Sequence, residues 1–362
     1  MLKIGIQRGK SLLKSKAVNG PKRAKSKKSW KILMKAIVYY EYGSPDVLKL
    51  EEVEKPSPKD NEVLVKVHAV ALNIGDWYML NGKPFMVRLM TGGLSKPKHK
   101  ILGNDIAGRV EAVGRNVKQF QPGDDVFGDI SEDGSGGFAE YVCARESALV
   151  LKPANLSFEE AAAVPMAAVT ALQGLRDIGK IQPGHKALIN GASGGVGTFA
   201  VQIAKSFGAE VTAVCSTRKL DMVRSIGADH VIDYTQEDFT QNGQRYDLII
   251  ASNGYHSLSD YKRALSPKGI YVCTGGSMAQ IFASMLLGPW MSRNGSQKMG
   301  NLSSKPNQKD LAFMKELLEA GKVVPVIDRC YPLSEAAEAL RYLGEGHAKG
   351  KVVITVAHNN KA

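Results

Sequence analysis

The residues best suited to bind a ligand form a glycine-rich run, Asn190-Gly191-Ala192-Ser193-Gly194-Gly195-Val196-Gly197. Apolar residues 186–189 before it are typical of a buried strand, and residues 198–205 after it repeat apolar side chains at helical spacing. Alone, such a run also fits an ordinary tight turn. Between a strand and a helix it favours a dinucleotide-phosphate loop, because the backbone can approach the phosphates and the first helical N–H groups point at them. We predict cofactor contacts from Ala192, Ser193, Gly194, Gly195, Val196 and Gly197.

The next predicted strand, residues 210–215, indicates which dinucleotide is bound. A site for NAD usually has a carboxylate at the end of this strand, about 20 residues beyond the loop, for the ribose 2′-hydroxyl. This chain has Ser216, Thr217 and Arg218 there. Hydroxyl and guanidinium groups suit a 2′-phosphate, so the predicted cofactor is NADPH. The same residues also fit the solvated, basic start of a helix.

Strand-like and helix-like patterns divide the body of the chain into two parts. From Met34 to about residue 157, short β segments separated by glycine turns prevail. From residue 158 to about 300, strands and helices alternate, which is typical of an α/β fold with a doubly wound parallel sheet. Residues 292–309 are polar and predict a loop, with a helix at 310–320. The last strand, 352–356, has no obvious partner nearby, and we expect it to return to the first part.

The positive charge of the chain is concentrated at its start. The net charge is +13 over 362 residues, but residues 1–33 hold nine Lys, two Arg and no acid, so the remainder carries only +2. The body therefore lacks the charge expected of a nucleic-acid-binding protein, and we expect no specific nucleic-acid partner. Three interpretations of the leader stay open: a start-site artefact with Met34 as the initiator, a mitochondrial presequence, or a disordered basic arm.

The four cysteines argue against a disulfide framework or a metal site, because no pair has metal-ligand spacing. Free thiols in a reducing compartment are expected, and the leader lacks the apolar core of a secretory signal, so we expect a cytoplasmic protein unless the leader is a presequence. The longest apolar stretch, residues 281–291, is too short to cross a bilayer.

Several motifs stand in a characteristic order. They are Ala36-Ile37-Val38, Asn73-Ile74-Gly75-Asp76, Gly103-Asn104-Asp105-Ile106-Ala107-Gly108, Gln121-Pro122-Gly123-Asp124, Gly136-Gly137-Phe138-Ala139-Glu140-Tyr141, an Ala-rich helix around Pro165, the glycine loop, and Gly350-Lys351-Val352-Val353. On these motifs residues 34–356 resemble the medium-chain dehydrogenase/reductase superfamily, in its zinc-free quinone oxidoreductase (zeta-crystallin-like) branch. The resemblance implies a GroES-like substrate domain (residues 34–157 and 301–362), a Rossmann NADP-binding domain (residues 158–300) and an active-site cleft between them.

The resemblance also bears on zinc. Zinc-dependent members have a Cys in the segment that matches residues 71–76 and a Gly-His-Glu further on, whereas this chain has no Cys in the first and Gly103-Asn104-Asp105 in the second. A catalytic zinc needs three protein ligands, so we expect no metal. Without zinc, hydride transfer from NADPH to a quinone or an α,β-unsaturated carbonyl is easier than alcohol oxidation, because the acceptor oxygen needs only a hydrogen-bond donor.

The segment from Asn73 to Tyr78 is similar to a family motif whose Asn and Tyr line the catalytic cleft. Tyr78 is the expected donor, although it could instead pack against Trp77 and Phe85. Asn73 fits a cleft contact or a turn role, and Asp76 fits bracing of the loop better than proton transfer.

Further cofactor contacts are expected from Thr170, Tyr234 and Gly254. The run 251–256 lacks the Asp that relatives commonly carry after the fourth Rossmann strand. This departure is expected to affect turnover more than cofactor binding.

The predicted function is therefore an NADPH-dependent oxidoreductase acting on a small hydrophobic quinone or enone, as a homodimer. Two alternatives stay open: another alcohol or carbonyl oxidoreductase of the same superfamily, and a non-enzymatic NADPH-binding interaction protein. The apolar stretch 281–290 suits either a hydrophobic wall of the cleft or a subunit contact.

Overall fold

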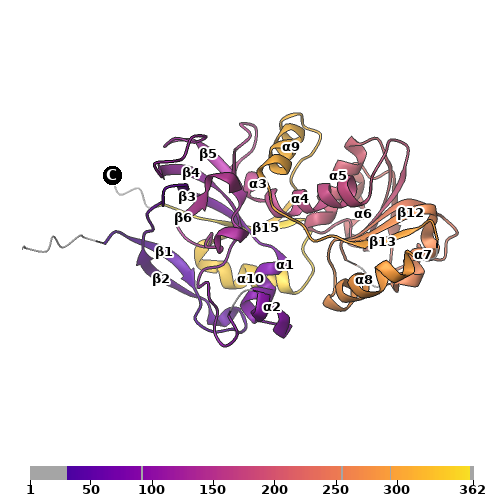
Figure 1. The fold of residues 1–362 in the computed structure, drawn as a ribbon, viewed down its shortest axis with the longest axis horizontal. Coiled ribbons are helices and arrows are strands. Elements are labelled where there is room, and N and C mark those ends of the chain that lie inside the picture. The colour runs from indigo at the N-terminus through magenta and orange to yellow at the C-terminus, as the bar shows by residue number, and fades with distance from the viewer. Residues whose placement is uncertain (1–30, 91–92, 254–255, 294, 359–362) are drawn as a thin grey trace, which may run out of the picture. The chain divides into compact units, whose positions relative to one another are not determined.

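Two large β-sheets carry the fold, one mostly antiparallel and one wholly parallel (Figure 1). The computed structural model describes residues 31–90, 93–253, 256–293 and 295–358. The predicted leader, residues 1–33, lies outside the described residues except for its last three positions, and so does Gly254. Residues 33–362 form one unit by their internal contacts.

The parallel sheet has the strand order of a Rossmann fold. Its neighbours run β10-β9-β8-β11-β12-β13, which in chain order is 3-2-1-4-5-6. The α/β prediction is thereby confirmed. The strands are β8 (Lys186–Asn190), β9 (Glu210–Cys215), β10 (His230–Asp233), β11 (Tyr246–Ala251), β12 (Leu265–Cys273) and β13 (Lys298–Asn301). The helices between them are α5 (Gly195–Ser206), α6 (Leu220–Ser225), α7 (Leu258–Ala264) and α8 (Met278–Met291).

The sixth strand, β13, corrects the prediction of a continuous loop over residues 292–309. It is a four-residue strand at the edge of the sheet, and only Met299 is buried. Edge strands are commonly short and polar, so β13 has no apolar alternation that a sequence pattern could reveal.

The second sheet runs β14-β15-β3-β4-β5-β7, with β6 also paired to β3. Its strands are β3 (Glu62–Ala71), β4 (Asp105–Val113), β5 (Asp125–Asp129), β6 (Tyr141–Arg145), β7 (Leu149–Leu151), β14 (Ile327–Pro332) and β15 (Lys351–Thr355), and a separate hairpin joins β1 (Leu33–Val38) to β2 (Lys49–Glu54). The last strand, β15, pairs antiparallel with β3, with Val353 opposite Ala71. The expected return of the chain end to the first sheet is confirmed.

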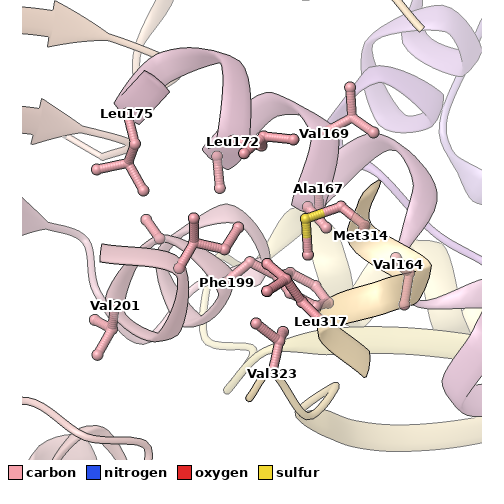
Figure 2. Packing of buried hydrophobic residues seen from close by; sticks show 14 of the residues in the cluster. Val164, Ala167, Val169, Leu172, Leu175, Phe199, Val201, Met314, Leu317 and Val323 are labelled. Atoms are coloured by element: carbon pink, nitrogen blue, oxygen red, sulfur yellow. The ribbon is translucent and has the colours of Figure 1, made fainter. Parts of the chain in front are cut away.

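Both sheets contribute to one apolar core. The core contains Ala71 of β3 and Ile189 of β8, and the helices α3 (Phe158–Ala162) and α4 (Pro165–Leu172) contribute mostly alanines. Small side chains let these helices approach both sheets closely. Figure 2 shows side chains from α4, α5, α9 (Gln308–Glu319) and their flanking segments packed together there. The labelled ones are Val164, Ala167, Val169, Leu172, Leu175, Phe199, Val201, Met314, Leu317 and Val323. The shared core holds the carboxyl end of β8 in a fixed relation to β3 and β4.

The remaining helices are α1 (Ile74–Asn81), α2 (Phe85–Met90) and α10 (Ala336–Gly344). The side of α1 that carries Trp77 packs against α10, where a Cβ on Gly344 would lie 2.6 Å from the Trp77 ring. Within the described ranges, no helix combines the length and apolarity needed to cross a membrane.

Candidate functional site

The turn between β8 and α5 requires glycine at two positions for different reasons. Gly191 has a φ of +82°, which side-chain-bearing residues rarely adopt. A Cβ on Gly197 would lie 2.1 Å from the Gly191 carbonyl oxygen, so only glycine lets the first turn of α5 pack this closely on the loop. The sequence therefore produces a tight strand-to-helix connection here.

The N-terminus of α5 has space in front of it. Its N-cap residue is Gly194, which has no side chain to cap the helix, and a Cβ there would meet only the Gly191 oxygen, at 3.5 Å. The first N–H groups of a helix have no intrahelical acceptor, and the helix dipole makes this end positive. Predicted contacts Ser193 and Ala192 are buried in the turn. The residues present fit the pyrophosphate of a dinucleotide.

The residues predicted for the 2′-phosphate lie at the ends of β9 and β10. Ser216 is half-buried, while Thr217 and Arg218 are exposed, and Arg218 has no ion-pair partner among the described residues. Tyr234 follows β10, donates its backbone N–H to the Cys215 carbonyl at 3.1 Å, and exposes 53% of its surface. The structure therefore brings these four predicted residues together.

A carboxylate that sequence reasoning missed also lies at this edge. Asp233, the last residue of β10, stands opposite Cys215 of β9, and its Oδ2 accepts a hydrogen bond from the Thr217 hydroxyl at 2.5 Å. Hydrogen bonds from Thr217 and Thr235 lower the pKa of Asp233 and keep it ionised. The sequence could have indicated Asp233, because adjacent parallel strands end at the same edge of a sheet and Asp233 ends the strand next to β9.

On the other side of the site, Asp76 braces the start of α1. It is wholly buried, and its two carboxylate oxygens accept the backbone N–H groups of Asn73 at 2.8 Å and Gly103 at 3.3 Å. Burial raises the pKa of Asp76 to about 6. Because both oxygens already bind backbone groups, the geometry favours the bracing role over proton transfer.

Tyr78 lies on α1 one turn after Ile74, which is half exposed, whereas Trp77 and Leu80 face the core. Its side chain is half-buried, and its hydroxyl has no hydrogen-bond partner in the described part of the chain. The neighbouring Phe85 is 60% exposed. A phenol in this state can donate a hydrogen bond to a ligand.

A buried charged cluster joins the predicted catalytic segment to the last strand. The Lys351 ammonium donates to Asn73 Oδ1 at 2.6 Å and lies 3.4 Å from Asp105 Oδ2. Asn73 Nδ2 donates to the same Asp105 oxygen at 3.0 Å, and the other Asp105 oxygen accepts the Met166 N–H of α4 at 3.0 Å. Predicted contact Thr170 is buried one turn beyond Met166.

Lys351 also lies beside the glycine turn. A Cβ on Gly195 would be 3.1 Å from Lys351 Cδ, and Gly350 donates its N–H to the Ser193 carbonyl at 2.9 Å. The structure therefore brings the predicted cofactor loop and Asn73 to two sides of one lysine. Asp105 and Lys351 stood in sequence motifs but were not predicted as site residues.

The described residues contain no group of three or more His, Cys, Asp or Glu side chains arranged to hold a metal ion. The cysteines of the chain are free, with Cys215 and Cys273 buried.

Comparison with known proteins identifies the family. A family described as "Alcohol dehydrogenase GroES-like domain" matches residues 59–154, and one described as "Zinc-binding dehydrogenase" matches residues 226–354. The chain is 36% identical to a "Chloroplast envelope quinone oxidoreductase homolog" of Arabidopsis thaliana, over 89% of this chain and 98% of that protein. It is 40% identical to a "2-methylene-furan-3-one reductase" of Solanum lycopersicum, over 89% and 79% respectively.

Two further comparisons agree. The chain is 36% identical to an "NADPH-dependent alkenal/one oxidoreductase, chloroplastic" of Arabidopsis thaliana, over 89% of this chain and 79% of that protein. The structure of the quinone oxidoreductase from Coxiella burnetii superposes with a TM-score of 0.79 at 31% identity, covering 90% of this chain and all of that one. With the GroES-like match and the Rossmann sheet order, these likenesses confirm the resemblance: the chain belongs to the medium-chain dehydrogenase/reductase superfamily, in its quinone oxidoreductase-like branch.

Proposed function

We propose that this protein is an NADPH-dependent reductase that transfers hydride to a quinone or an α,β-unsaturated carbonyl. The observation that carries the proposal is the position of Lys351, whose stem lies beside Gly195 of the phosphate loop while its ammonium binds Asn73 of the catalytic segment. When bound, NADPH would supply the hydride. The relatives reported above include a quinone oxidoreductase homolog and an NADPH-dependent alkenal/one oxidoreductase, which supports both the acceptor class and the cofactor.

The chain's own residues would bind the cofactor at two places. The open N-terminus of α5 suits the pyrophosphate, and Ser216, Thr217 and Arg218 suit the 2′-phosphate. Asp233 opposes this preference, because it is ionised and hydrogen-bonded to Thr217. The balance between Arg218 and Asp233 therefore sets the choice between NADPH and NADH.

At the substrate, the residues of α1 would hold the oxygen that gains negative charge. Tyr78 donates its O–H to that oxygen. Asn73 presents its amide from the N-terminus of α1, and Asp76 fixes the loop through its two backbone partners. These residues need only align the acceptor and donate a hydrogen bond.

We further infer that the reaction does not use zinc. The segment 71–76 has no Cys or His, and Asn104, at the position of the His in zinc-dependent members, is buried and accepts a hydrogen bond from Ser135 at 2.6 Å. One of the matching families is nevertheless described as zinc-binding, so elemental analysis is the test. We expect less than stoichiometric zinc and full activity after chelation; one tightly bound, essential zinc per chain would contradict the inference.

A panel of acceptors tests the main proposal. NADPH oxidation is measured with quinones, enones, saturated aldehydes and ketones, and the reverse reaction with simple alcohols and NADP. We expect turnover with quinones or enones and a higher kcat/KM for NADPH than for NADH. Turnover confined to alcohols and saturated carbonyls would move the protein to the other oxidoreductases of the superfamily. NADPH binding without turnover of any acceptor would favour a non-enzymatic role.

We also propose a homodimer. Strand β13 is an edge of the parallel sheet, and α8 beside it exposes Leu286, Trp290 and other large apolar side chains. Sedimentation equilibrium of the parent and of Leu286→Glu tests this proposal. We expect a dimer that the charged variant weakens; a parent monomer at micromolar concentration would exclude it.

We infer a cytoplasmic location, because the leader has no apolar core and its basic residues are mostly Lys rather than the Arg typical of transit peptides. Two relatives carry chloroplast names, so the leader itself is the test. We expect a fluorescent protein fused to residues 1–33 to stay diffuse, and a chain that starts at Met34 to fold and bind NADPH like the full chain. Import of the fusion into an organelle would overturn the inference.

A further inference from the structure

Lys351 is a buried cation between the two sides of the proposed site. Only 3% of it is exposed, and lysines are almost never buried to this degree unless they are paired. Its partners are Asn73 and Asp105, which lie 278 and 246 positions away in the chain. The fold therefore holds its ammonium at one place, where two distant segments of the second sheet meet.

The contacts of Lys351 leave the Asn73 amide one orientation. An ammonium can only donate hydrogen bonds, and an ionised carboxylate can only accept them. Oδ1 of Asn73 must therefore face Lys351, at 2.6 Å, and Nδ2 must face Asp105, at 3.0 Å. One Nδ2 hydrogen is used by Asp105, and the second stays available to a ligand. Lys351 and the Asp105 carboxylate specify the same orientation, so the oxygen and nitrogen of the amide could exchange places only if both charges were removed.

The stem of Lys351 has a separate role at the cofactor loop. Its Cδ is 3.1 Å from the position of a Cβ on Gly195, the first residue of α5. A parallel bridge between Gly194 and Gly350 fixes the backbone on both sides of this contact. The same side chain that orients Asn73 thus lies against the start of the helix that would bind the phosphates.

We propose that Lys351 is a positioning residue for the reduction: its ammonium fixes the orientation of the Asn73 amide, and its stem sets where that amide lies relative to the N-terminus of α5. This inference rests on the proposed function, because Asn73 is taken to face the reacting groups. Lys351 acts through Asn73 and is not itself required to touch the substrate.

A neutral pair of substitutions separates this role from simple stabilisation. Lys351→Met alone would leave the Asp105 carboxylate buried without its cation, and Asp76 and Asp129 add negative charge nearby. The variant Lys351→Met/Asp105→Asn removes both charges and keeps side chains of similar size. It should fold, but an amide at position 105 no longer dictates which end of Asn73 faces it. Lys152→Met is the matched control, because Lys152 is half-buried and donates to the Pro153 and Leu156 carbonyls away from the site.

The first measurement needs no substrate. In ¹⁵N-labelled protein the side-chain amide signals of Asn73 are assigned by their loss in Asn73→Ala, and their exchange with water is followed. We expect two separate, slowly exchanging signals in the parent and in Lys152→Met, and at least about 10-fold faster exchange in the neutral pair. A rapidly exchanging Asn73 amide in the parent would overturn the proposal before any variant at 351 is made.

The second measurement is a double-mutant cycle, in which kcat and the Kd of NADPH are determined for each variant. We expect Asn73→Ala and the neutral pair each to lower kcat by about 10-fold, and their combination to lower it by little more than either alone, since both remove the same oriented amide. The proposal would be overturned if the two effects on kcat multiplied in the combined variant. It would also be overturned if the neutral pair folded and kept both the kcat and the amide exchange rate of the parent. If the parent turns over no quinone or enone, the proposed function fails, while the amide exchange still decides whether Lys351 orients Asn73.

Discussion

The turn between β8 and α5 contains no charged side chain, whereas the cluster facing it, at Asn73, Asp105 and Lys351, consists of buried charged and amide groups. The turn works through its backbone: glycine at 191 and 197 lets the helix start close to the strand and leaves N–H groups unoccupied. The cluster works through side chains that come from three distant strands and loops. The turn therefore excludes side chains at positions 191 and 197, whereas the cluster depends on every one of its charged and amide partners.

A steric effect on cofactor binding is expected where the turn has no room. In Gly197→Ala the new Cβ would lie 2.1 Å from the Gly191 oxygen, so the loop must move away from α5. Overpacking of this kind costs about 1–3 kcal/mol. We expect the Kd for NADPH to rise by at least about 10-fold, measured by fluorescence titration.

The control for this variant is Gly75→Ala. Gly75 lies in α1, and a Cβ there would meet nothing within 4 Å, so NADPH affinity should not change and helix propensity should slightly stabilise the fold. Unchanged binding in Gly197→Ala would show that the turn is not the phosphate loop.

On the α1 side of the site, the loss of one hydrogen-bond donor should lower kcat and leave NADPH binding unchanged. Tyr78→Phe removes the O–H that we assign to the substrate oxygen, and one such donor is worth about 10- to 1000-fold in kcat. The Kd for NADPH should stay the same. The effect should be larger for enones than for quinones, whose reduced oxygen is better stabilised.

Tyr40→Phe is the matched control, since the Tyr40 hydroxyl binds Glu51 on the exposed hairpin. An unaltered kcat for every substrate in Tyr78→Phe would make Tyr78 a packing residue, and the donor would then be another group or water.

The same contrast explains what sequence could predict. The glycine turn is local, since its strand, its glycines and its helix are consecutive, and the expected Rossmann sheet and the return of β15 were confirmed. The Asn73–Asp105–Lys351 cluster depends on the pairing of β3 with β4 and with β15, and no local sequence pattern predicts which distant strands pair. Strand β13 was missed because its only buried side chain is Met299. Asp233 was not predicted because it ends β10, whereas the residues typical of the cofactor preference follow β9, and the pairing of the two strands is not a local sequence pattern.

The buried carboxylates near Lys351 should also make the stability of the fold depend on pH. Asp129 stands directly opposite Asp105 in the β4–β5 pair, and burial together with the Asp105 charge raises the pKa of Asp129 to about 7 from 3.8. A raised carboxyl pKa means that the folded state holds the proton more tightly, so stability is highest at low pH and falls as pH rises from about 4 through 7.

We therefore expect Asp129→Asn to be more stable than the parent at pH 8 and the gain to vanish near pH 4. At about 1.4 kcal/mol per pKa unit, a gain on the order of 4 kcal/mol is expected at pH 8. Urea unfolding at both pH values measures it, with Asp221→Asn, on a fully exposed side chain, as the control. A variant that is less stable at pH 8 would show that Asp129 is ionised and favourably paired.

Groups of opposite charge, the exposed Arg218 and the half-buried Asp233, compete at the edge of the sheet where β9 and β10 end. Arg218→Ala removes a cation with no ion-pair partner in the described part of the chain, and a charge-assisted contact to a phosphate is worth about 1.5–3 kcal/mol, so kcat/KM for NADPH should fall by roughly 10-fold or more. NADH has no 2′-phosphate, so its kcat/KM should hardly change.

Asp233→Asn should act in the opposite direction and raise the preference for NADPH by a few-fold, because it removes a negative charge beside Thr217. Arg224→Ala, which breaks only the ion pair with Asp221 on α6, is the control. If the parent uses both cofactors equally, or if Arg218→Ala weakens both alike, the edge does not read the 2′-phosphate and Asp233 is the dominant group there.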